Sequence, residues 1–217
     1  MRLSRFLATH FYHSEELCHA LAIDEDTLAI WQQNGLFPKP SYCIKNQLSC
    51  SSYSGLYECE EYDDFYPRGC VNWGQGLAKQ KIDSSSQAFN YFAQQYSASL
   101  TKLAQQGFEF NEELFGCELE EHLQQVWQQF LCSKYGVLTQ NGLIEEIAAV
   151  DIGRLVVDDI TELRTKPNLT QAERSKLHPA LKLLNRALSH GAEHEKQHTL
   201  RARYIDALVL KYDLSVK

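Results

Sequence analysis

The chain has 217 residues, of which 44% are hydrophobic and 23% are charged, and this balance excludes a disordered or fibrous protein. The length fits one large domain or two small ones. No apolar run approaches the ~18 residues that a membrane span needs, so we expect no membrane contact and a cytoplasmic location.

The net charge of −7 is unevenly distributed along the chain. Residues 46–75 carry one basic and five acidic residues, whereas residues 164–217 carry eleven basic and five acidic ones. A basic C-terminal part can face nucleic acid or an acidic partner, or pack against the acidic middle of its own chain. We expect first that the basic C-terminal part packs against the acidic middle of the chain.

Seven cysteines are present, an odd number. The gaps between Cys43, Cys50, Cys59 and Cys70 are six, eight and ten residues, and they do not form the paired Cys-x-x-Cys knuckles of a zinc ribbon. We therefore expect reduced thiols, some of them buried as small hydrophobes.

Two short helices are predicted near the N-terminus. The first begins at Ser14 and the second is capped by Asp24, carries Trp31 on its apolar face and ends near Gly35. A tight turn at residues 22–23 separates them, which is a helix-turn-helix pattern.

The next segment has no helical period. Pro38 and Pro40 stop helix formation, and residues 41–76 are rich in Tyr, Cys, Ser and Gly. Short strands or an ordered loop are predicted here, with a strand over Tyr42–Lys45 that turns at Asn46.

The remainder is predicted to be helical from the three- and four-residue spacing of its apolar residues. Thr170 and Glu173 form a predicted capping box. The expected helices cover residues 84–107, 118–135, 143–163, 170–191 and 192–212.

We therefore expect a mainly α chain in three parts. Residues 1–45 form a helix-turn-helix-like module, residues 46–80 an aromatic and cysteine-rich connection with short β or irregular structure, and residues 81–217 a helical, bundle-like C-terminal domain.

Three segments of the first part, Tyr12–Leu17, Leu21–Leu28 and Gly35–Pro38, resemble the start of a MerR-type DNA-binding domain. The resemblance covers about residues 10–45. It implies a short helix pair, a Gly-Leu-Leu-x-Pro-like exit and a β-hairpin wing. Residues 65–73 are similar to an uncharacterised bacterial family with a similar N-terminal module, a likeness that implies no activity.

The charge of the helix pair departs from the MerR-type pattern. The family's second helix usually carries an Arg that meets the DNA backbone, and Ala29 or Ile30 takes that place here. Residues 24–37 contain three acids and no Lys or Arg. Because cations supply non-specific affinity for DNA, we expect a protein partner or self-association, with nucleic acid as the alternative.

Four residues are the candidates for contact with a partner or DNA: Lys39, Lys45, Trp31 and Arg68. Arg68 can also anchor an anion, or pair with Asp63 or Asp64, and the pairing is the favoured interpretation.

A second motif, His194-Glu195-Lys196-Gln197-His198, matches the zinc-protease pattern. On a helix, His194 and His198 would share a Zn²⁺ and Glu195 would act as general base. Lys196 lies between the two His, and no downstream Glu follows, which favours a solvated polar face. We expect no cofactor, with zinc as the alternative.

Asp151 is the carboxylate of its predicted helix to inspect, because Val150 and Ile152 flank it. If it is buried, it needs a partner such as Arg154 or an Arg of the basic tail. His122 is expected to be a half-buried histidine.

Together these features predict a non-catalytic binding or regulatory protein whose helical part dimerises or holds a small ligand. The competing hypothesis is a metal-dependent hydrolase that uses His194, Glu195 and His198.

Overall fold

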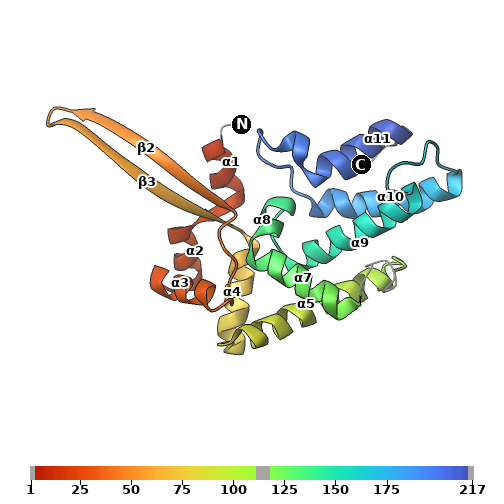
Figure 1. Ribbon diagram of the computed structural model, residues 1–217, viewed down its shortest axis with the longest axis horizontal. Helices are drawn as coiled ribbons and strands as arrows, with labels where there is room; N and C mark the ends of the chain where they lie inside the picture. The colour runs from red at the N-terminus through yellow and green to blue at the C-terminus, as the bar shows by residue number, and fades with distance from the viewer. Residues whose placement is uncertain (1–2, 111–117, 215–217) are drawn as a thin grey trace.

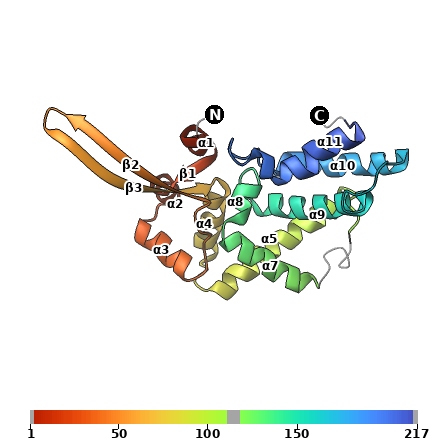
Figure 2. The same ribbon diagram turned by 45° about the horizontal axis from the view of Figure 1, so that its top comes forward.

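The computed structural model describes residues 3–110 and 118–214. Its N-terminal elements are α1 (Leu3–His10), β1 (Phe11–His13), α2 (Ser14–Leu21), α3 (Glu25–Gln33), β2 (Tyr42–Ser52), β3 (Gly55–Pro67) and α4 (Gly69–Gln80). The following elements are α5 (Ser85–Gln105), α7 (Leu119–Leu131), α8 (Lys134–Leu138), α9 (Ile144–Thr161), α10 (Gln171–Ala187), the 3₁₀ helix η1 (Lys196–His198), the π-helix η2 (Ala202–Asp206) and α11 (Ala207–Tyr212). Figures 1 and 2 show a helical body with a long β-hairpin projecting from one end.

Local capping explains the helix pair at the N-terminus. The side chain of Asp24 accepts a hydrogen bond from the Thr27 amide at 2.8 Å, which confirms the predicted cap of α3. The residue that caps α2 is His13, and Ser14 is the first residue of the helix. The His13 ring accepts a hydrogen bond from the Glu15 amide, and the Glu16 carboxylate accepts one from the His13 amide. Ala22 then closes α2 in the left-handed conformation, with φ of 54°.

The β-sheet has three antiparallel strands in the order β1-β3-β2. Strands β2 and β3 pair continuously from Tyr42↔Phe65 to Ser52↔Gly55, and a two-residue turn connects them. Gly55, the first residue after this turn, has a φ of 120°. β1 pairs only with the last residues of β3, from Phe65 to Pro67. Residues 46–61, which we call the outer hairpin, therefore lie beyond the third strand.

This hairpin corrects two expectations. The mainly α class is wrong: helices predominate, but the chain is mixed because an antiparallel sheet with strands of 11 and 13 residues interrupts them. The predicted turn at Asn46 is also wrong, since β2 continues to Ser52. Residues 47–58 are all exposed, so these strands are not defined by the burial of one apolar face.

The principal apolar core joins the N-terminal helices to the helical body. It includes Leu17 of α2, Trp73 of α4, Phe92 of α5, Trp127 of α7 and Ile152 of α9, all buried. A second cluster fills the space between α9, α10, η2 and α11, and a small third cluster packs α1 and β1 against the segment that precedes η1. The capping box predicted at the start of α10 is confirmed.

The last predicted helix, over residues 192–212, is wrong in its first half. Gly191 has a φ of 67°, residues 193–195 form a turn, and a short 3₁₀ helix follows over Lys196–His198. The Glu195 carboxylate holds this turn by accepting the Ala192 amide at 3.1 Å. Helical backbone resumes at Leu200 and passes through the π-helix η2 into α11.

Across the described ranges, no helix combines the length and the apolar character that crossing a membrane would require.

Candidate functional site

The outward face of α3 is apolar and acidic. Ala29 and Ile30 are exposed, Ile30 to 53%, and Glu25 and Asp26 occupy the first turn of the helix. Leu28 faces inward and is buried. No Lys or Arg lies on this helix, so its free surface offers no cation to a phosphate.

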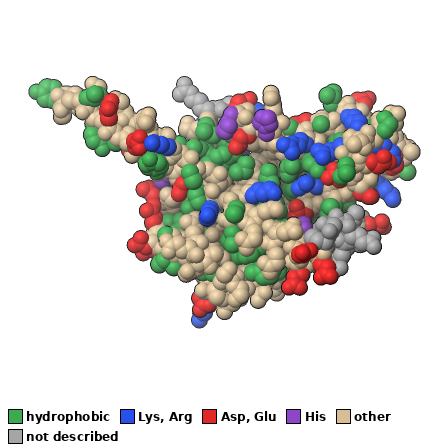
Figure 3. Space-filling model, in the orientation of Figure 1, with side chains coloured by type: hydrophobic (Ala, Val, Ile, Leu, Met, Phe, Trp, Pro, Cys, Tyr) green, Lys and Arg blue, Asp and Glu red, His purple; other side chains and the backbone are tan. Residues whose placement is uncertain are grey.

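The outer hairpin likewise exposes apolar and acidic side chains, over a larger area than α3. Leu48, Tyr53, Leu56 and Tyr57 are all exposed, with Tyr53 at the turn fully so. The five acids of residues 46–75 all lie on β3, and no Lys or Arg lies within the outer hairpin. At about 3.3 Å per residue, the 11 paired residues of β2 span about 35 Å. Figure 3 shows this ribbon standing clear of the body.

The structure does not bring the four predicted contact residues together as a free basic patch. Lys45 pairs with Glu60 at 2.9 Å. Trp31 is half-buried and lies against Phe37, with ring centroids 5.8 Å apart. Lys39 is exposed on the loop before β2.

Arg68 stacks on the ring of Tyr12 at 4.6 Å and donates to the Thr9 carbonyl at 3.2 Å. The expected pairing of Arg68 with Asp63 or Asp64 is therefore wrong. Asp63 accepts instead from His13 of β1, at 3.0 Å.

The His-Glu-x-x-His segment is not helical in the way that the zinc hypothesis requires. His194 lies in a turn and His198 in the 3₁₀ helix, and both are exposed. Glu195 accepts a hydrogen bond from the Tyr42 hydroxyl at 2.7 Å, and burial together with this bond raises the pKa of Tyr42. No group of three or more His, Cys, Asp or Glu side chains with metal-binding geometry occurs among the described residues.

A buried polar cluster occupies the centre of the helical body. Asp151 of α9 is 8% exposed and accepts a hydrogen bond from the Tyr96 hydroxyl of α5 at 2.8 Å. His122 of α7 lies 3.1 Å from the same hydroxyl, so three helices meet at one oxygen. Burial and the neighbouring carboxylate raise the pKa of Tyr96, which keeps it a neutral donor.

Asp151 is thus buried, and its partner is Tyr96 and not the suggested Arg154. No ion pair joins Asp151 to Arg154 in the part of the chain that the structure describes, and Arg154 lies 5.3 Å from the ring of Tyr204. Tyr204 donates to Asp158 at 2.6 Å, which ties η2 to α9.

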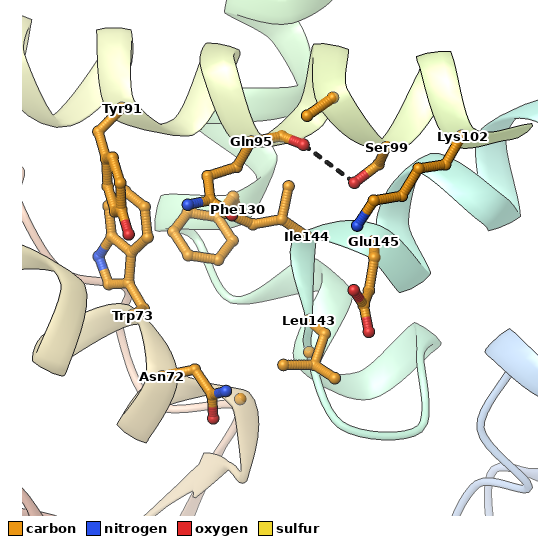
Figure 4. Close-up of a pocket in the computed structure, with 13 residues that line it drawn as sticks. Asn72, Trp73, Tyr91, Gln95, Ser99, Lys102, Phe130, Leu143, Ile144 and Glu145 are labelled. Carbon is orange, nitrogen blue, oxygen red and sulfur yellow. Dashed lines mark hydrogen bonds between the residues drawn. The ribbon is translucent and has the colours of Figure 1, made fainter.

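A pocket of about 200 Å³ opens between α4, α5, α7 and the start of α9. Figure 4 shows that its two ends differ in chemistry. Trp73, Tyr91 and Phe130 form an aromatic end, and Lys102 and Glu145 lie at the other. Trp73 also donates its indole N–H to the Leu36 carbonyl, just after α3, at 2.8 Å.

A model of a family of unknown function, DUF6058, matches residues 88–213, more than half of the chain. The chain belongs to this family. The searches among curated proteins and among solved structures gave no match. The DUF6058 match runs from α5 to α11 and so includes the buried polar cluster and the α5, α7 and α9 walls of the pocket.

The expectation of a family of unknown function is thus confirmed, although residues 65–73, which carried that likeness, lie outside the DUF6058 match. No MerR-type match was found. Sequence reasoning missed the pocket, because its walls come from four separate elements. The available signal of the pocket was a row of polar residues along α5, namely Gln95, Ser99 and Lys102. A helix buried on all sides would lack such residues.

Proposed function

We propose that the N-terminal part of this DUF6058 protein is a non-catalytic binding module with a helix-turn-helix and a wing, and that it contacts a protein partner. What supports the proposal is the order of its elements: α2 and α3 follow each other across a three-residue connection, and the β2–β3 hairpin comes directly afterwards. The outer hairpin occupies the place of the wing.

The types of side chain exposed on α3 and on the outer hairpin favour a protein partner over DNA. The outward face of α3 and the outer hairpin present exposed apolar side chains among carboxylates. Non-specific affinity for DNA comes from Lys and Arg side chains that neutralise several backbone phosphates. Of the three cations named as candidates, Lys45 is paired with Glu60 and Arg68 stacks on Tyr12, which leaves Lys39.

The outer hairpin by itself also favours a partner. A two-stranded ribbon exposed on both faces is marginally stable in water, and its free edges are open to strand pairing. Exposed apolar groups of this kind commonly mark protein contact sites. We infer that the partner surface has an apolar centre and a cationic rim, complementary to the acids of β3.

The test is site-specific photo-crosslinking in cells. A photoreactive amino acid is placed at Ile30 on α3 and at Leu56 on the outer hairpin, with Leu210 on α11 as the control because it is 86% exposed. We expect discrete protein adducts at the first two positions and not at Leu210. An adduct of two copies of this chain would identify self-association as the protein contact.

Two results would overturn the proposal. One is the same adduct pattern at all three positions. The other is a salt-sensitive mobility shift of duplex DNA that disappears in the Lys39→Gln, Lys45→Gln double variant. The His-Glu-x-x-His hydrolase hypothesis is not proposed, because Glu195 is engaged by Tyr42 and the two histidines do not share a helix face.

A further inference from the structure

We propose that the pocket between α4, α5, α7 and α9 binds a small zwitterion with a flat apolar body, that is, an aromatic α-amino acid. This site is separate from the surfaces of α3 and the outer hairpin, so it does not depend on the proposed partner. The size of the pocket and the arrangement of its side chains support this ligand class.

Size limits the ligand first. An apolar cavity of about 150 Å³ is large enough to hold benzene, so a pocket of about 200 Å³ holds one ring and a few further atoms. Dinucleotides and most cofactors need larger pockets, since ligand sites for drug-sized molecules measure about 300–1,000 Å³. The ligand is therefore small.

The aromatic end selects a flat group. The ring of Trp73 lies 5.3 Å from that of Tyr91 and 5.2 Å from that of Phe130, so three rings from α4, α5 and α7 meet here. A ligand ring placed against them gains apolar burial and an offset or edge-to-face ring contact. Leu143 and Ile144 add aliphatic contact on the α9 side.

The other end carries both signs of charge. Lys102 of α5 and Glu145 of α9 both line the pocket, away from the aromatic end in the view of Figure 4. Within the described ranges, neither side chain makes an ion pair or a hydrogen bond, with the other or with a third residue. A lone cation would favour a simple acid and a lone carboxylate a simple amine. The presence of both, unpaired, fits a head group with adjacent carboxylate and ammonium.

Two amides also line the pocket, Asn72 of α4 and Gln95 of α5, and both residues are solvent-exposed. Ser99 is already satisfied, because it donates to the Gln95 carbonyl at 2.9 Å, as the dashed line in Figure 4 marks. The two amides can therefore orient the polar end of a ligand, and the aromatic end contributes most of its burial.

The test is calorimetric titration of the purified chain with L-phenylalanine and three fragments of it. 3-Phenylpropanoate lacks the amine, 2-phenylethylamine lacks the carboxylate, and L-alanine lacks the ring. We expect L-phenylalanine to bind most tightly and L-alanine not to bind at millimolar concentration. Lys102→Gln should weaken L-phenylalanine and 3-phenylpropanoate about fivefold and leave 2-phenylethylamine unchanged, since partly exposed pairs contribute about 1 kcal/mol or less.

Glu145→Gln should have the opposite selectivity, weakening L-phenylalanine and 2-phenylethylamine only. Matched controls are Lys182→Gln on α10 and Glu121→Gln on α7, which remove exposed charges away from the pocket. Either of two results overturns the proposal: no heat with L-phenylalanine, or binding that the pocket variants change no more than the controls do. Because no partner protein is present, failure here is distinct from failure of the crosslinking test.

Discussion

We expect the hydroxyl of Tyr96 to stabilise the helical body, because it is buried and donates a hydrogen bond to a carboxylate. Tyr96 is completely buried, donates to Asp151 at 2.8 Å and lies 3.1 Å from His122. Tyr96→Phe removes this oxygen without changing the ring, and leaves the carboxylate of Asp151, a residue 8% exposed, with His122 Nε2 at 3.6 Å as its remaining polar neighbour. Because hydrogen bonds to charged groups contribute about 1.5–3 kcal/mol, we expect the free energy of unfolding to fall by about 2–3 kcal/mol.

The assay is urea unfolding followed by circular dichroism, with melting temperature as a second measure. For a chain of this length the predicted loss corresponds to about 4–12 °C. Tyr135→Phe is the matched control, because its buried phenol donates only to the neutral Gln129 side chain, at 3.1 Å, and should lose about 1 kcal/mol.

A double-mutant cycle with Asp151→Asn separates the bond from the packing. If the Tyr96–Asp151 bond carries the effect, Tyr96→Phe should lose about 1 kcal/mol less in the Asp151→Asn background than in the native chain. A Tyr96→Phe protein within about 0.5 kcal/mol of the native one would refute the reasoning, since it would show that the carboxylate is solvated without the phenol.

Three further predictions concern other parts of the fold. The hydrogen bond from Lys166 lowers the pKa of Glu173 to about 2, below its ordinary 4.5. The stability gained from this bond is therefore present above pH 4.5 and is lost as the pH falls toward 2. Glu173→Gln should make the melting temperature less dependent on pH over that range. Gly153→Ala would place a Cβ 2.7 Å from Leu184 Cγ and should lower the free energy of unfolding by about 1–3 kcal/mol in urea, whereas native stability would show that α9 and α10 can separate. Replacing the outer hairpin by a two-residue Asn-Gly turn should change that free energy by less than about 0.5 kcal/mol while abolishing crosslinking there, and a large loss would show that the hairpin supports the body.

Helices with one apolar face were predictable from the sequence because their local signals agree with their packing. Asp24 and Thr170 cap their helices as expected, and α5 and α9 lie close to the predicted ranges. The hairpin was not predictable to its full length. Its strands bury neither face over residues 47–58, so they are defined mainly by backbone pairing and not by an apolar face that packs on a core.

The candidate sites depended on contacts between distant residues. The break in the last predicted helix involves Glu195, which is bound by Tyr42, 153 positions away, and no local pattern indicates that contact. Asp151 shows the same limit: its flanking apolar residues marked it as the carboxylate to inspect, but the choice of Tyr96 over Arg154 as partner is made by the packing of α5 against α9.

The link between the pocket and the N-terminal module is a single buried side chain. Trp73 packs against Phe92, Trp127 and Phe130 of the helical body, and its N–H binds the Leu36 carbonyl at the exit of α3. Because the indole is only 4% exposed, it cannot shift toward or away from a ligand ring without stretching that bond or disturbing the core. A ligand at the aromatic end and a partner on α3 would therefore act on opposite sides of one rigid group. Coupling between them would appear as a change in ligand affinity when the partner is bound, with the reciprocal change in partner affinity.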